Sequence, residues 1–243
     1  GPDAMRFRGG IAQFTSRLAL ELSETSELSF FSWKELYPQV FISRKNLNRS
    51  AQTAATYPSK ALLSYSRPWS WKKTAVAIAG EHPEKIFLTW SHPVHTPVYL
   101  ALVRMLRSRS NAEIVAICHN VLPHEKFPFA EQATKKFFAA VDRVIVHSQA
   151  EASRLKALDA KVLSTSLFMP SFDIFPPLKS RSAHTNPQIL FFGNIRPYKG
   201  LDTLLLAMPE LLRLKPTLKL LIAGEPFYKS SSRLLRIFHR PKN

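Results

Sequence analysis

Apolar and polar residues occur in regular blocks along most of the chain, and the clearest series spans residues 188–225. It opens with an apolar run at 189–192, which is short enough for a buried parallel strand. After a loop, leucines recur at helical spacing from residue 201 to 212, and Pro216 ends that helix. A second apolar run at 218–223 ends at Gly224. The pattern predicts a strand–helix–strand unit with parallel strands.

A similar alternation runs through the first two thirds of the chain. We predict strands at 28–33, 86–90, 114–118, 143–147 and 161–168. Helices are predicted at 11–22, 69–79, 98–106 and 129–140, and another begins after Ser148, which starts a capping-box pattern with Glu151. Residues 34–68 hold several prolines and many polar residues and are predicted to be irregular. Alternating strands and helices predict an α/β fold with parallel sheets.

The domain boundaries follow from local composition. Gly9 and Gly10 stand where a strand would turn into a helix, yet the residues before them are too few for a strand, so a first strand is missing from the pattern. At 170–187, prolines stand among Ser, Lys and Arg, a composition that predicts a linker. We therefore predict an N-terminal domain at 1–169, a linker at 170–187 and the beginning of a C-terminal domain at 188–243.

The loop at 193–200 carries two cations, Arg196 and Lys199, just ahead of a predicted helix. A helix N-terminus offers unpaired N–H groups and a partial charge of about half a positive unit. Together these groups favour a phosphate or a diphosphate. A strand–helix turn with solvated cations is the alternative, and the chemistry of the loop leaves both open.

Histidines follow two of the predicted strands. Ligands of parallel sheets bind beyond the carboxyl ends of the strands, and His119 lies directly after the strand at 114–118. It could hydrogen-bond a ligand or carry charge there, or simply be a structural loop residue. A metal site with His124 and Glu125 is disfavoured, because the spacing matches no zinc pattern. His92 and His95 follow the strand at 86–90 and are candidate ligand contacts.

Composition narrows the class of protein. A single cysteine excludes a disulfide scaffold and fits a reducing compartment, and Cys118 closes an apolar run, as a buried structural thiol does. No apolar run approaches the roughly 20 residues of a membrane span, and no secretory leader opens the sequence. We therefore predict a cytoplasmic location.

The formal net charge of +17 predicts anionic partners such as acidic lipid, nucleic acid or phosphorylated substrates. Zinc-finger spacing, an aromatic RNA-binding string and a long basic tail are all missing from the sequence, which disfavours nucleic acid. An anionic membrane surface, with the protein peripheral on its inner face, is the preferred partner.

The string G-N-I-R-P-Y-K-G-L-D at 193–202, followed by a helix and a strand ending in A-G-E, resembles the donor-binding half of glycosyltransferase family 4. The resemblance implies the GT-B architecture, in which two Rossmann-like domains hold a ligand in the cleft between them. It also implies that Arg196 and Lys199 grip the diphosphate of a nucleotide-sugar. Gly193, Gly224 and Glu225 are further candidate contacts of the same ligand.

Two N-terminal strings resemble the same family. R-G-G-I-A-Q-F at 8–14 resembles its glycine-rich loop, which implies that Gly9 and Gly10 face the donor phosphates. C-H-N-V-L-P-H-E at 118–125 resembles a subgroup whose histidine, here His119, contacts the donor sugar or its phosphate. Asn120 stands where most members have Asp or Glu, and it is a candidate donor or acceptor contact.

The resemblance implies sugar transfer with retention, from a nucleotide-sugar to a hydroxyl of a glycan or lipid-linked glycan. The expected setting is cell-envelope glycolipid or polysaccharide synthesis, with no metal or other cofactor. Family members continue beyond A-G-E with a pair of glutamates seven residues apart, which residues 226–243 do not contain, so we expect a truncated C-terminal domain. An inactive fragment that binds nucleotide, lipid or protein is the alternative function.

Overall fold

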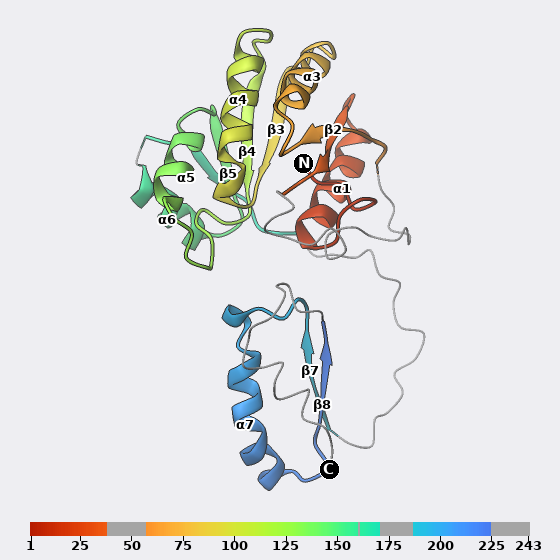
Figure 1. Ribbon diagram of the computed structural model, residues 1–243, viewed down its shortest axis with the longest axis vertical. Coiled ribbons are helices and arrows are strands. Elements are labelled where there is room, and N and C mark those ends of the chain that lie inside the picture. The colour runs from red at the N-terminus through yellow and green to blue at the C-terminus, as the bar shows by residue number, and fades with distance from the viewer. Residues whose placement is uncertain (38–56, 160, 171–186, 225–243) are drawn as a thin grey trace. The chain divides into compact units, whose positions relative to one another are not determined.

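The computed structural model describes residues 1–37, 57–159, 161–170 and 187–224 (Figure 1). The chain divides into two compact units, residues 1–175 and residues 176–243, which are described separately below. The division lies inside the stretch 170–187, most of which falls outside the described residues.

The N-terminal unit alternates strands and helices as its sequence pattern predicts. The strands are β1 (Phe30–Glu35), β2 (Ser59–Ser64), β3 (Lys85–Trp90), β4 (Glu113–Cys118), β5 (Arg143–Val146) and β6 (Ser164–Ser166). The helices are α1 (Gly10–Ser23), α3 (Pro68–Ala79), α4 (Thr96–Arg107), α5 (Ala130–Phe138) and α6 (Gln149–Leu158), with a 3₁₀ turn, η1, at Pro93–His95. No helix in the described ranges is long and apolar enough to cross a bilayer.

The strands of this unit form two parallel sheets. One has the order β1-β2, and the other has the order β3-β4-β5-β6. Trp90 is paired with Cys118, and Cys118 with Val146, so the carboxyl ends of β3, β4 and β5 lie level with one another. The predicted α/β class with parallel sheets is confirmed.

Aromatic side chains fill the core beside the larger sheet. The ring of Trp90, at the end of β3, stacks on Phe137 of α5 with the ring centroids 4.6 Å apart. Tyr99 of α4 also packs on Phe137, and its hydroxyl donates a hydrogen bond of 2.7 Å to the carbonyl of Thr89. This packing holds α4 and α5 firmly against the carboxyl end of β3.

The described part of the C-terminal unit is one parallel strand–helix–strand unit, as predicted. It consists of β7 (Gln188–Phe192), a 3₁₀ turn η2 (Pro197–Lys199), α7 (Leu201–Leu214) and β8 (Lys219–Ala223) (Figure 1). Leu201 is buried, whereas Leu190 and Phe192 of β7 and Leu221 of β8 are exposed. Alternate strand residues, such as Ile189 and Leu220, are half-buried. The prediction of a buried strand at 189–192 is therefore wrong for the described residues, because a sheet of two strands has too few neighbours to bury its side chains.

The structure corrects three predicted segments. Residues 34–68 are not irregular throughout, because Ser59–Ser64 form β2. The prediction missed β2 because its pairing with β1 is a tertiary contact, and only Ala61 to Leu63 of this strand are apolar. The first strand lies at Phe30–Glu35 instead of 28–33, and the strand predicted at 161–168 is limited to Ser164–Ser166, whose residues are all exposed.

Candidate functional site

Two histidines stand at the carboxyl ends of neighbouring strands in the N-terminal unit. His119 follows β4 and His147 follows β5, and their ring centroids are 5.1 Å apart. Phe14 of α1 packs edge-on against both, at 4.9 Å from His119 and 5.0 Å from His147. Strand pairing therefore brings together residues that are far apart in sequence.

The environment of His119 keeps its imidazole neutral. Burial, followed by the nearby His147, lowers the pKa of His119 to about 4. Its Nε2 atom is buried and has no hydrogen-bond partner among the described residues. Burial also lowers the pKa of His147, an effect that the backbone of Leu167 opposes. At neutral pH, His119 can therefore exchange a hydrogen bond with a polar ligand, but it carries no charge.

Glu151 fixes the loop that carries His119 and Asn120. The Val121 N–H donates a hydrogen bond of 2.6 Å to the Glu151 carboxylate, and the Glu151 N–H donates one of 3.2 Å to Ser148 Oγ. The cap at Ser148 is thus confirmed. The Glu151 side chain reaches the loop after β4, so it ties the first turn of α6 to the backbone next to Asn120.

The glycine loop before α1 is open. Gly9 has φ of 114°, and a Cβ atom at Gly9 or Gly10 would meet no heavy atom within 4 Å. Among the described residues no side chain caps the N-terminus of α1, whose first N–H groups have no partner within the helix. Phe14 lies about 6 Å further along the helix, so this helix end lies near the two histidines.

The two other predicted histidine contacts have different surroundings. His95 is 1% exposed, lies among Trp33, Tyr37 and Tyr99, and its Nε2 pairs with the carbonyl of Leu36 at 2.9 Å. Burial lowers its pKa to about 3. His92 is half-buried and caps η1, with its Nδ1 accepting a hydrogen bond from Val94 N–H. His92 is therefore the better placed of the two for a ligand.

In the C-terminal unit, Lys199 folds back to the end of β7. An ideal Cβ at Gly193 would lie 2.7 Å from Lys199 Nζ, and Gly193 has φ of 112°. Gly200, with φ of 71°, caps α7 without any side-chain hydrogen bond. Arg196 is half-buried at the start of η2. The strand end, both cations and an uncapped helix N-terminus thus belong to one short loop.

A second glycine adjoins this loop. An ideal Cβ at Gly224 would lie 1.9 Å from the carbonyl oxygen of Gly193, a position that only glycine can occupy. Beside it, the Gly193 N–H donates a 2.9 Å hydrogen bond to the Ala223 carbonyl. The structure thus brings Gly193, Lys199 and Gly224 together. Glu225 lies outside the described residues.

The chemistry of these groups suits an anion in the C-terminal unit and a polar, uncharged group beside the histidines. Sequence reasoning missed His147, Phe14 and Glu151 as members of the site. A histidine directly after the strand at 143–146 repeats the pattern of Cys118-His119 and could have identified His147.

The described residues contain no group of three metal-ligating side chains suited to hold an ion. Cys118 is buried, which raises the pKa of its thiol well above the usual range and makes it a structural thiol.

The loop at 193–200 lies within a segment that matches a known protein family. Residues 177–238 match the family described as Glycosyl transferases group 1. A D-inositol 3-phosphate glycosyltransferase from Segniliparus rotundus is 26% identical over 159 residues. That similarity covers 56% of this chain and 35% of the relative, so the chain spans about a third of that protein's length.

Proposed function

We propose that this chain forms part of a glycosyltransferase that takes a sugar from a nucleotide-diphosphate donor. The observation that carries the proposal is the loop from Gly193 to Gly200, which combines two cations with the uncapped N-terminus of α7. This loop lies within the segment that matches Glycosyl transferases group 1. The diphosphate would be bound there.

Binding of a diphosphate at this loop would also serve the chemistry. When the glycosidic bond to the donor breaks, negative charge develops on the departing diphosphate. Arg196, Lys199 and the N–H groups at the start of α7 would stabilise that charge. No metal ion is part of the proposal, since the two side-chain cations supply the positive charge.

The proposal also gives roles to residues of the N-terminal unit. Backbone N–H groups after Gly9 and Gly10 would contact the donor phosphates, and His119, neutral at pH 7, would orient the sugar through one hydrogen bond. Asn120 and His92 would be further contacts. The acceptor would be a hydroxyl of a glycan or lipid-linked glycan, and the sugar would be transferred with retention of its anomeric configuration. The reaction would belong to cell-envelope synthesis and take place at the cytoplasmic face of an anionic membrane.

The proposal is tested by titrating the chain with UDP- and GDP-sugars in a calorimeter. We expect saturable binding, and we expect Arg196→Ala combined with Lys199→Ala to weaken it by on the order of 2–4 kcal/mol, since two charge-assisted contacts are lost. Lys215→Ala with Lys219→Ala is the matched control. Both of these lysines are exposed in the same unit, so the same net charge is removed away from the loop.

Equal weakening by both double variants would show a diffuse charge effect and would contradict a site at the loop. Failure of a cooperatively folded chain to bind any nucleotide-sugar would contradict the proposal as a whole. In that case the alternative function, a binding module for acidic lipid or protein, would be tested next.

A further inference from the structure

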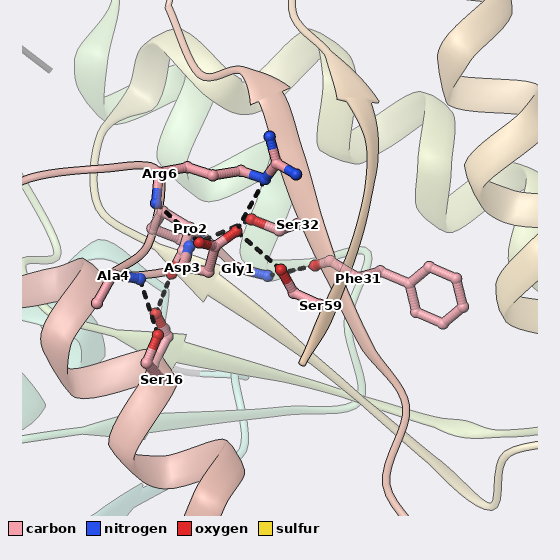
Figure 2. A network of polar contacts seen from close by, with 10 residues as sticks. Gly1, Pro2, Asp3, Ala4, Arg6, Ser16, Phe31, Ser32 and Ser59 are labelled. Atoms are coloured by element: carbon pink, nitrogen blue, oxygen red, sulfur yellow. Dashed lines mark hydrogen bonds and ion pairs between the residues drawn. The ribbon is translucent and has the colours of Figure 1, made fainter. Parts of the chain in front are cut away.

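The helices of the N-terminal unit differ in how their charges are compensated. In α1, Arg17 pairs with Glu21 at 2.7 Å. Ahead of this helix, Arg6 contacts the buried carboxylate of Asp3 at 3.6 Å (Figure 2). In α6, an arginine again pairs with a glutamate of the same helix. These cations are therefore neutralised by carboxylates of the chain itself.

Helices α3, α4 and α5 have no such balance. Together they hold six Lys or Arg residues and one acidic residue, Glu131. Arg107, at the end of α4, pairs with Asp142. The side chains of the other five cations are exposed and have no ion pair or hydrogen bond with any described residue: Lys72, Lys73, Arg104, Lys135 and Lys136. Because α4 packs against both α3 and α5, these charges lie on one layer of neighbouring helices (Figure 1).

The outer face of α3 combines this charge with an exposed tryptophan. At the spacing i, i+3, i+4 and i+7, which defines one helix face, stand Trp69, Lys72, Lys73 and Val76. All four are exposed, Trp69 by 70% and Val76 by 50%. The turn below them is fixed, since the Ser64 N–H donates a 2.9 Å hydrogen bond to Ser70 Oγ. A tryptophan held in this way beside lysines is typical of a residue at a membrane–water interface.

A second aromatic residue is exposed at the start of α5. Phe129 is 79% exposed and has φ of 56°, a left-handed conformation that is uncommon for a bulky residue. Lys126, three residues earlier, is exposed as well. A strained and exposed aromatic residue contributes little to the packing of the unit, so its conformation points to a functional role.

Both exposed rings stand at the end of the unit that carries the candidate histidines. Helices α3 and α5 each begin after the carboxyl end of a parallel strand. The ring centroid of Tyr65, ahead of α3, lies 6.4 Å from that of His95. That of Phe127, ahead of α5, lies 4.8 Å from His92. The loop after β3 is therefore flanked by the starts of both helices, and since β3 pairs with β4, it adjoins the loop that carries His119.

We propose that the outer faces of α3, α4 and α5, together with the exposed rings of Trp69 and Phe129, form the surface by which the N-terminal unit docks onto an anionic lipid bilayer. The two rings would enter the headgroup region, and the five unpaired cations would contact anionic lipid headgroups. The apolar Val76 on the same face favours lipid over nucleic acid, which proteins contact through charge and stacking.

This orientation would bring the loops after β3 and β4 to the bilayer surface. The net charge of the chain favours an anionic partner without selecting a face, whereas the unpaired cations and exposed rings select one. Under the proposed function, the acceptor would then be carried by a lipid and would reach the loop of His119 from the membrane. That last step rests on the proposed function, but the docking surface does not.

The test measures binding of the chain to phosphatidylcholine vesicles with and without about 30% phosphatidylserine. Lys72→Gln with Lys73→Gln should lower the partition coefficient for the anionic vesicles about 25-fold, because each lysine near such a surface contributes about fivefold. Lys156→Gln with Lys161→Gln is the matched control. It removes the same charge from exposed positions in α6 and just after it, and it should lower the coefficient by less than about threefold.

Tryptophan fluorescence gives a readout that charge alone does not move. Trp33 and Trp90 are fully buried, so vesicle binding should shift the emission of Trp69 to shorter wavelength, and the shift should vanish in Trp69→Phe. Phe129→Asn, which suits a left-handed conformation, should weaken binding at least about fivefold because an apolar ring is lost.

Equal loss of binding in the two double-lysine variants, or an unshifted emission in the bound chain, would overturn the proposal. So would binding to a single-stranded polynucleotide without binding to the vesicles, because nucleic acid would then be the partner of this face. No nucleotide-sugar enters these measurements, so their outcome is separate from that of the donor titration.

Discussion

Substitution of Gly224 by alanine probes the part of the C-terminal unit on which the proposed phosphate loop depends. The added methyl carbon would lie 1.9 Å from the carbonyl oxygen of Gly193 and 2.8 Å from its carbonyl carbon. Both obstacles are backbone atoms, so no side-chain rotation relieves the overlap. The ends of β7 and β8 would have to separate.

The loss of stability caused by Gly224→Ala can be worked out from the contacts that are broken. The hydrogen bond from Gly193 N–H to the Ala223 carbonyl, 2.9 Å long, is adjacent to the overlap, and its loss costs about 1 kcal/mol. Forced displacement of packed backbone adds about 1–3 kcal/mol. We therefore expect Gly224→Ala to destabilise this unit by about 2–4 kcal/mol. Since the loop begins at Gly193, affinity for a nucleoside diphosphate should fall at least about tenfold, or 1.4 kcal/mol.

The assay is hydrogen exchange of peptides covering 188–224, with calorimetric titration of a nucleoside diphosphate. Gly80→Ala is the matched control, because Gly80 has an ordinary φ of −68° and its nearest heavy atom is 3.4 Å from an ideal Cβ. Its effect should stay within about 0.5 kcal/mol. Unchanged exchange in β7 and β8 of the Gly224→Ala chain would refute the close approach of the two strand ends.

Two further predictions concern histidines. Under the proposed function, His119→Ala should greatly reduce sugar transfer while leaving affinity for the nucleoside diphosphate within about twofold. An equal loss of nucleoside diphosphate binding would contradict the proposed role of His119 at the sugar. Burial holds the pKa of His95 at about 3, against 6.5 when unfolded, so the unfolded chain takes up a proton first as the pH falls. This contribution to stability is complete above pH 6.5, and about 2 kcal/mol of it should be lost at pH 5. In urea titrations the wild-type chain should lose about 2 kcal/mol more stability than His95→Gln between pH 7 and pH 5, because the contribution of His119 is lost in both chains. A loss of equal size in both would disprove the prediction.

Much of the architecture was predictable because it depends on local patterns. The apolar runs that form β3, β4, β7 and β8 are short and continuous, a pattern that is typical of parallel strands. The α7 helix shows apolar residues at helical spacing between Gly200 and Pro216. The prediction from sequence missed β2, because its apolar run is short and its partner, β1, lies more than 20 residues earlier.

The candidate site was predictable only in part. Arg196 and Lys199 stand close together in the sequence, so their common loop is a local feature. The contact of His119 with His147 depends on the alignment of β4 with β5, and that of both with Phe14 depends on where α1 packs. Such contacts join residues far apart in the chain, and no local pattern encodes them.

The sequence by itself thus determined the α/β class, the strand–helix–strand unit at the C-terminal end and the presence of cations ahead of α7. Only the tertiary structure decided that His95 is buried, that His147 adjoins His119, and that β1 and β3 lie in separate sheets. The physical reason is the range of the interactions: helix periodicity and strand hydrophobicity act over a few residues, whereas burial, pKa and strand order arise when distant segments pack.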